Sequence, residues 1–147
     1  MKDMPAMPAD TPADLLALAS RALPELQSLQ SRATEALRAL VAPQGKPEAA
    51  LLEQHQHAAH ALSWLTTYVE SLRQLTAWAA RLSDAGNLGR TEALILQIGL
   101  GEYLTQIAGG IPMSQTEFAR LSDLGLDWQP GDDARAHRSV TLHHLGQ

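Results

Sequence analysis

The feature that most constrains the fold is a long stretch without a helix breaker, which runs from Pro47 to about Asp84 and ends before Gly86. Proline is favourable at the first helical position, and a helix of this length would extend roughly 55 Å. Two adjacent apolar stripes recur along the stretch at helical spacing. Such a wide apolar face predicts a helix that contacts at least two neighbours. The first stripe comprises Ala58, Leu62, Leu65, Val69, Leu72, Thr76 and Ala79, and the second comprises Trp64, Tyr68, Leu75, Trp78 and Leu82.

A second long helix is predicted from Pro12 to Val41. Thr11 supplies a hydroxyl cap, and Asp14 lies in the first turn, where a negative charge interacts favourably with the helix dipole. Apolar residues then follow in steps of three and four, which makes one stripe. Pro24 interrupts this helix, but the stripe keeps its phase across the proline, which favours one kinked helix over two helices. A loop rich in proline, residues 42–47, joins the two long helices.

A third helix is predicted from about Arg90 to Ala108, after a turn that Gly86 begins. Its centre, residues 93–101, is apolar on nearly all sides, so we expect this helix to be buried on most sides. Gly99 and Gly101 each lower helix stability by about 1 kcal/mol relative to alanine. Their presence favours close approach of another backbone or of a ligand.

A short fourth helix is predicted after the glycine–proline turn at residues 109–113. Ser114 and Glu117 have the S-x-x-E spacing of a capping box, in which each residue satisfies a backbone N–H of the other. The helix would run from Ser114 to about Asp123, and Gly125 would close it.

The predicted fold class is all-α, an antiparallel bundle of about four helices, two of them long. The 147 residues suit a single domain with a sizeable core. We expect the bundle domain to span residues 11–125, after a disordered leader at residues 1–10. Residues 126–147 are predicted to form a polar C-terminal tail, with Trp128 packing back onto the bundle.

Composition excludes several classes of function. The chain has no cysteine, so disulfides, zinc–thiolate sites and thiol catalysis are excluded, and a cytoplasmic location is expected. The formal net charge is −5 and no basic run occurs, which argues against a nucleic-acid partner. No apolar run approaches the ~18 residues of a membrane span, so no membrane partner is expected.

Three polar residues near the start of the second long helix could hold a metal ion: Glu53, His57 and His60. His57 and His60 lie one turn apart on one helix face, and Glu53 precedes His57 by four residues. Helical di-metal bundles use a Glu-x-x-His pair from each of two helices, and this chain contains no such pair. These residues, together with His55, are therefore better interpreted as part of a helix surface or interface, and no metal is expected.

Other candidates are weaker. Glu102 follows the apolar centre of the third helix and could act as a general base beside a buried pocket, although a structural contact to a helix end or to Arg81 is the simpler interpretation. His143 and His144 suggest a metal tract only if the tail is ordered. Three aromatic residues at helical spacing are interpreted as core or interface residues rather than as a cofactor site: Trp64, Tyr68 and Trp78.

Part of the chain resembles a known family. The segments WLTTYVESLRQLTAWAARL, EALILQIGLGEYLTQIAGGIPMSQTEF and DLGL, all between Ala61 and Leu126, resemble the helical N-terminal extension of some bacterial acyl-CoA dehydrogenases, those of the methylsuccinyl-CoA dehydrogenase type. The resemblance covers about the middle half of the chain, and GEYL…GGIPMSQ…E is its most specific part. In that family the extension precedes the flavin-binding catalytic region, to which nothing after Leu126 corresponds. We therefore assign no catalytic residue and no cofactor.

The resemblance implies a non-catalytic accessory or assembly domain. Its expected partners are a second copy of the chain or an acyl-CoA dehydrogenase, with Trp64, Tyr68 and Trp78 as interface candidates. A stand-alone metal-binding or ligand-binding bundle is the alternative, using the three metal candidates and Glu102. A catalytic fragment that keeps dehydrogenase activity is a third hypothesis.

Overall fold

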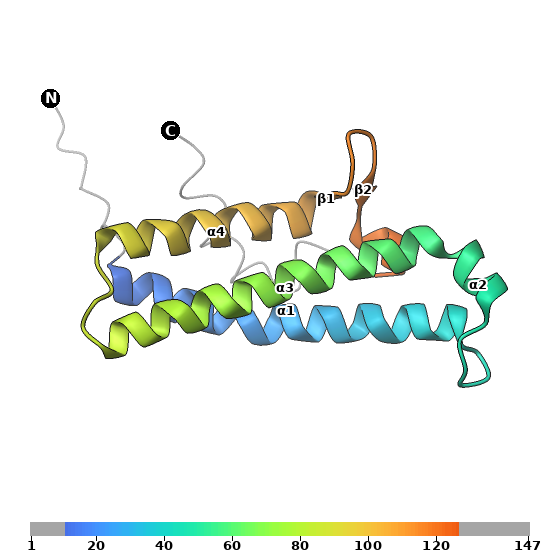
Figure 1. Cartoon of the computed structure of the whole chain (residues 1–147), viewed down its shortest axis with the longest axis horizontal. Helices are drawn as coiled ribbons and strands as arrows, with labels where there is room; N and C mark the ends of the chain where they lie inside the picture. The colour runs from blue at the N-terminus through green and yellow to red at the C-terminus, as the bar shows by residue number, and fades with distance from the viewer. Residues whose placement is uncertain (1–10, 127–147) are drawn as a thin grey trace, which may run out of the picture.

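The computed structural model describes residues 11–126, which form an antiparallel bundle of three long helices (Figure 1). A short helix, a small β hairpin and a 3-10 helix complete the fold near one end. The elements are α1 (Pro12–Val41), α2 (Ala49–Gln54), α3 (Gln56–Asp84), α4 (Arg90–Gly109), β1 (Ile111–Pro112), β2 (Phe118–Ala119) and η1 (Leu121–Leu124). The predicted all-α bundle is confirmed.

Several expectations fall outside the described residues. The leader at residues 1–10, nearly all of the tail at residues 126–147, the packing of Trp128, and His143 and His144 belong to this group. Leu126, the first residue of the expected tail, packs against the core. None of the helices within residues 11–126 combines the length and the apolar character that a membrane crossing needs.

The start of α1 is fixed by the predicted cap. The Thr11 hydroxyl oxygen accepts the backbone N–H of Asp14 at 3.2 Å, and the Thr11 N–H donates to Asp14 Oδ2 at 3.1 Å. The Thr11 side chain and then its backbone N–H lower the pKa of the Asp14 carboxyl. As predicted, a single helix then runs unbroken through Pro24 to Val41.

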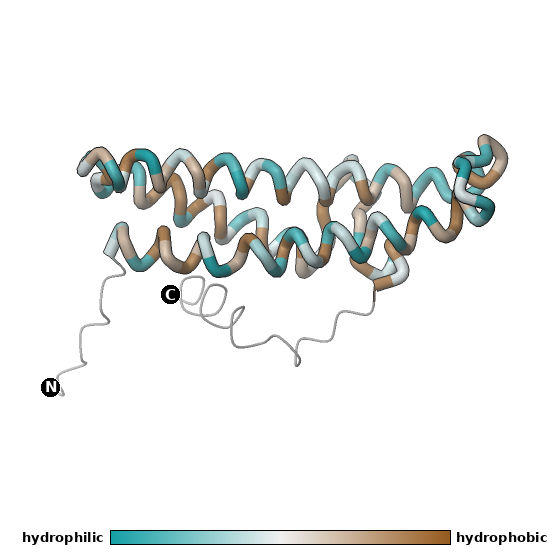
Figure 2. The backbone as a smooth tube through the Cα atoms, turned by 90° about the horizontal axis from the view of Figure 1, so that it is seen from below, coloured by the Kyte–Doolittle hydropathy of each residue, from teal (hydrophilic) through white to brown (hydrophobic). Residues whose placement is uncertain are grey.

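The core lies where the apolar stripe of α1 meets α3 and α4. Apolar and polar residues are interspersed along the helices (Figure 2), as in amphipathic helices, whose apolar residues recur every three or four positions. The first predicted stripe of α3 is buried except for Leu62, which is half-buried. The largest completely buried side chains are Leu65, Leu72 and Leu96.

The second long helix is interrupted at His55, so the prediction of one helix from Pro47 to Asp84 is wrong. His55 has φ −108° and ψ 24°, which separates α2 from α3. The Glu48 N–H donates to the Val41 carbonyl at 2.9 Å, which ties the start of α2 to the end of α1. The chain therefore bends at His55, because α3 must follow its apolar stripe along the bundle while α2 stays at the end of α1.

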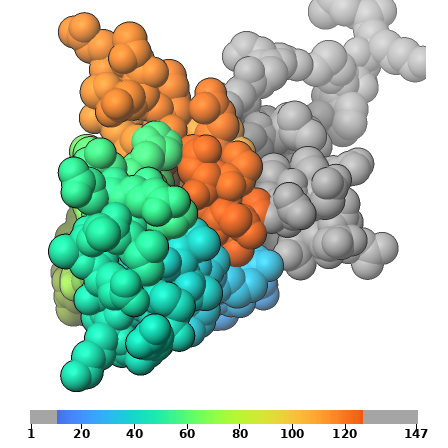
Figure 3. Space-filling model, turned by 90° about the vertical axis from the view of Figure 1, so that its right-hand side faces the viewer, coloured from blue at the N-terminus to red at the C-terminus, as the bar shows by residue number. Residues whose placement is uncertain are grey.

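The predicted fourth helix from Ser114 to Asp123 is also wrong. Ile111 pairs with Ala119 across an antiparallel hairpin, and both side chains are buried in the core. Ser114 N–H donates to the Glu117 carbonyl at 3.3 Å inside the hairpin turn, rather than to a helix cap. Burial of the two opposed apolar residues thus outweighs the local capping signal. Figure 3, which looks at this end of the molecule, shows the hairpin projecting from the helices.

The chain regains a helical turn only at η1. The Arg120 N–H donates to Asp123 Oδ2 at 2.8 Å, which caps the first turn of η1. Gly125 follows with φ 68°, a left-handed conformation that favours glycine. It was predicted to end the fourth helix, and in the structure it ends η1 instead.

Candidate functional site

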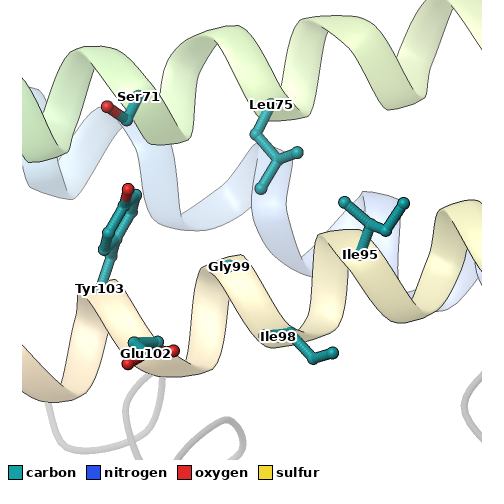
Figure 4. Close-up of a pocket in the computed structure, with 7 residues that line it drawn as sticks. All are labelled: Ser71, Leu75, Ile95, Ile98, Gly99, Glu102 and Tyr103. Atoms are coloured by element: carbon teal, nitrogen blue, oxygen red, sulfur yellow. The ribbon is translucent and has the colours of Figure 1, made fainter.

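A groove between α3 and α4 brings together side chains of both helices. It encloses about 400 Å³ and is open to solvent. In Figure 4, Leu75 points from α3 toward Gly99, and Ile95 and Tyr103 point from α4 toward α3, whereas Ile98 lies farther out on α4. The lining residues are Ser71, Leu75, Ile95, Ile98, Gly99, Glu102 and Tyr103.

The two glycines of α4 have different roles. A Cβ placed on Gly99 would lie 2.5 Å from Leu75 Cδ2, so this glycine lets the Leu75 side chain approach the α4 backbone. A Cβ placed on Gly101 would meet no described atom within 4 Å. The sequence predicted close approach of another backbone or of a ligand at both glycines. At Gly99 a side chain approaches instead, and at Gly101 no described atom does.

An aromatic row adjoins the groove through Tyr103, which is one of its lining residues. The rings of Tyr68 and Tyr103 lie 4.5 Å apart between centroids, and Trp64 packs edge-on against Tyr68 at 6.3 Å. The Tyr68 hydroxyl donates to Gln106 Oε1 at 2.5 Å. Gln106 in turn donates through Nε2 to Glu102 Oε1 at 3.5 Å. These contacts connect the core of α3 with the rim of the groove on α4.

Burial raises the pKa of the Tyr68 phenol above its usual value of 10.0. Tyr103 and then Glu102 raise this pKa further, because a negative charge on either group disfavours a second negative charge on Tyr68. Tyr68 therefore stays neutral and acts as a hydrogen-bond donor within the fold.

The chemistry of the groove favours binding over reaction. Glu102, the candidate general base, is exposed at the rim, and its hydrogen-bond partner among the described residues is Gln106. Three side chains of the lining could take part in acid–base or nucleophilic steps: Ser71, Glu102 and Tyr103. The other walls are aliphatic or glycine, which suits an apolar side chain of a binding partner.

The surface of α4 beside the groove is apolar and exposed. The exposed fractions of Leu94, Ile95 and Ile98 are 46%, 47% and 64%. The expectation that this helix is buried on most sides is therefore wrong for the described chain, because α1 and α3 cover one side only. Residues three and four apart share a helix face, and we call this face the α4 outer face; it comprises Thr91, Leu94, Ile95, Ile98, Gly101, Glu102 and Thr105.

The metal candidates are not brought together. Glu53 lies on α2, on the other side of the His55 break from the two histidines of α3. His57 Nε2 lies 3.4 Å from Asp123 Oδ2, and His60 Nε2 accepts the indole N–H of Trp64 at 3.0 Å. Within residues 11–126, no group of three or more histidine, cysteine or acidic side chains is arranged to hold a metal ion.

The three interface candidates differ in accessibility. Tyr68 is 8% exposed and lies between α3 and α4, so its contacts are internal. Trp64 and Trp78 are half-buried and pack against the core. Their role as partner contacts remains a prediction.

The α4 outer face was not predicted from the sequence. The apolar character of α4 on nearly all sides could have indicated it, since such a helix needs neighbours on every side. Once the predicted fourth helix is replaced by a hairpin, the described chain holds too few long helices to supply those neighbours.

The fold is a helical bundle with an apolar groove, and comparison with known proteins relates this bundle to the acyl-CoA dehydrogenases. No family model matches the chain. The chain is 58% identical over 123 residues to the (2S)-methylsuccinyl-CoA dehydrogenase of Cereibacter sphaeroides. The match covers 83% of this chain and 22% of that enzyme, so the chain is homologous to part of an acyl-CoA dehydrogenase and spans about a fifth of its length. The predicted resemblance is confirmed.

Proposed function

We propose that this chain is a non-catalytic assembly module that acts together with an acyl-CoA dehydrogenase in the cytoplasm. The observation that carries the proposal is the 58% identity to one part of such an enzyme. A second copy of the chain and a dehydrogenase polypeptide are the two partners that this role implies.

The described site supports a binding role. The groove and the α4 outer face offer aliphatic side chains, hydroxyl groups and one exposed carboxylate, which suit contact with protein better than turnover of a thioester. Stable modules of this size seldom leave several aliphatic side chains together on one face unless a partner covers them.

Exchange of the homologous segment tests the proposal. In the Cereibacter enzyme, the segment that matches this chain is either replaced by this chain or deleted. We expect the replacement to keep the oligomeric state and the dehydrogenase activity per bound flavin. We expect the deletion to change the oligomeric state. A replacement that loses assembly, or a deletion that leaves assembly unchanged, would contradict the proposal.

The isolated chain supplies an independent measurement. We expect a colourless preparation that does not oxidise (2S)-methylsuccinyl-CoA. A yellow preparation with bound flavin would support a catalytic fragment instead. Stoichiometric metal in the same preparation would support the alternative of a metal-binding bundle.

A further inference from the structure

We infer that the groove between α3 and α4 receives a lysine or arginine side chain of a partner polypeptide, with its cationic group at Glu102 and its aliphatic stem along Leu75 and Ile98. The inference rests on the proposed function, because it names the chemical group by which the partner is recognised. The hydrogen-bonding capacity of the side chains that line the groove determines this class of occupant.

The polar and the aliphatic side chains of the groove lie toward different ends. Because α3 and α4 are antiparallel and Leu75 packs onto Gly99, the residues four before Leu75 and four after Gly99 lie at the same level. Ser71 therefore lies across the groove from Tyr103, as Figure 4 shows. Glu102 lies toward the same end, whereas the two isoleucines lie toward the other. An occupant with a polar head and an apolar stem fits this division.

The polar end is rich in hydrogen-bond acceptors. The Ser71 hydroxyl donates to the Thr67 carbonyl at 2.7 Å, so only its lone pairs remain for a partner. The carboxylate of Glu102 accepts hydrogen bonds only, and the Tyr103 hydroxyl can accept as well. Among the lining residues, all within residues 11–126, none has a cationic group or a side-chain N–H. A head group with several N–H donors is therefore favoured, and an anion is not.

The Glu102 carboxylate is held in place from the core. The buried Tyr68 hydroxyl donates to Gln106 Oε1, and Gln106 Nε2 donates to Glu102 Oε1 at 3.5 Å. An exposed glutamate is otherwise free to change rotamer, and ordering it on binding costs entropy. This chain of hydrogen bonds lowers that cost. Within residues 11–126 it engages one carboxylate oxygen, so Oε2 is left for a partner.

Lysine and arginine match both ends of the groove. Each ends in a cation with several N–H donors, and hydrogen bonds between ionised groups are about twice as strong as neutral ones. Their methylene stems pack on apolar surface while the charged head stays at a polar rim, which suits walls that Leu75, Ile95 and Ile98 provide. The net charge of −5 adds attraction toward a basic partner.

The open shape of the groove favours a polypeptide over a small molecule. Sites for small molecules bury about 70–90% of the ligand surface, whereas this groove is open to solvent and Ile98 on its wall is 64% exposed. A side chain anchored on a partner backbone needs no such enclosure, because contacts around the groove exclude water once the partner is bound.

Titration of the full-length chain with butylguanidinium, followed by amide chemical shifts, tests the preference for a cation. This probe has the stem and the head of an arginine side chain. We expect it to shift the resonances of Ser71 and Glu102, and butyrate to leave them in place. Glu102→Gln should weaken the binding about fivefold or more. Glu53→Gln is the matched control, because it removes an exposed carboxylate of α2, outside the groove, and it should change the affinity less than about twofold.

A second variant tests the hydrogen-bond chain that holds Glu102. Tyr68→Phe keeps the carboxylate but releases Gln106, so butylguanidinium should bind about two- to threefold more weakly than to the wild type. The loss should be smaller than in Glu102→Gln. Circular dichroism confirms that each variant keeps its helix content. An affinity that Tyr68→Phe leaves unchanged would overturn the positioning role of this chain.

Charge reversal in the dehydrogenase tests the source of the cation. In the Cereibacter enzyme that carries this chain as its exchanged segment, Glu102→Arg should change the oligomeric state, and Glu53→Arg should not. Unchanged assembly, together with butylguanidinium binding by the isolated chain, would overturn the partner polypeptide and assign the cation to a small molecule.

These outcomes are separate from a failure of the proposed function. Equal binding of butylguanidinium by the wild type and Glu102→Gln would overturn the recognition of a cation at this carboxylate. The exchange of the whole segment would still decide whether the chain acts in assembly, because that experiment measures the oligomeric state without any change at Glu102.

Discussion

Tyr68 shows how one residue can join the core to the site. Its ring packs against Tyr103, its hydroxyl donates to Gln106, and its backbone belongs to the buried stripe of α3. The sequence placed Tyr68 in an apolar stripe at the correct spacing. It could not show that the hydroxyl points toward α4, because the partner lies 38 residues away in the chain.

Removal of the Tyr68 hydroxyl should destabilise the fold modestly. Tyr68→Phe keeps the ring contacts and loses a hydrogen bond, so the free energy of unfolding should fall by about 1 kcal/mol. Urea denaturation at neutral pH measures the change. Tyr103→Phe is the matched control, since no hydrogen bond of its hydroxyl is found within residues 11–126, and it should change stability by less than about 0.5 kcal/mol. Equal losses in the two variants would show that the Tyr68–Gln106 bond contributes nothing.

The raised pKa of Tyr68 predicts a loss of stability at alkaline pH. The neutral phenol is favoured in the folded state, so its contribution is complete below the unfolded pKa near 10.0. Above that value the unfolded chain releases the proton first, and stability falls as the pH rises toward the folded pKa. Between pH 10 and pH 11 the wild type should therefore lose more stability than Tyr68→Phe. A smaller loss in the wild type would reverse the assigned direction of the shift.

At the scale of elements, α4 combines two glycines that the structure distinguishes. Gly101→Ala should raise the free energy of unfolding by about 1 kcal/mol through helix propensity. Gly99→Ala should gain less or lose stability, because its Cβ would lie 2.5 Å from Leu75 Cδ2 and force that side chain to rotate. Chemical denaturation of both variants measures the difference. Equal gains would show that Leu75 moves without cost.

The elements also show what local sequence determines. The caps and periodicity of α1 are local, and its bounds Pro12–Val41 were predicted correctly. The α3 stripes were predicted correctly as well, because spacing within one helix defines a face. The hairpin was not predicted, since the pairing of Ile111 with Ala119 depends on a core that only the assembled helices create. The break at His55 was not predicted, because no glycine or proline near His55 signals it. It accompanies the hydrogen bond from the Glu48 N–H to the Val41 carbonyl, which holds the start of α2 at the end of α1.

At the scale of the whole molecule, the candidate site was only partly predictable. Glycine in an apolar helix indicated a close approach near Gly99, and Glu102 does lie at the edge of a hollow. The sequence assigned the partner surface to α3, because α3 has two apolar stripes. In the structure both stripes are buried or half-buried, and the aromatic residues of α3 stay untested as partner contacts. Three of the exposed large apolar side chains, Leu94, Ile95 and Ile98, lie on α4. Periodicity shows how many apolar faces a chain has, and only the packing shows which of them remain open.

The antiparallel bundle also gives the molecule the properties of a strut. α1 begins at one end, whereas η1 lies toward the other, where Asp123 approaches His57 at the start of α3 (Figure 1). The first and last described residues thus lie at separated points along the bundle, whose helix α1 has 30 residues and is roughly 45 Å long. The points at which residue 11 enters the bundle and residue 126 leaves it are therefore held apart by a stiff rod. The distance between these two points is set by helix length, to which one residue adds about 1.5 Å.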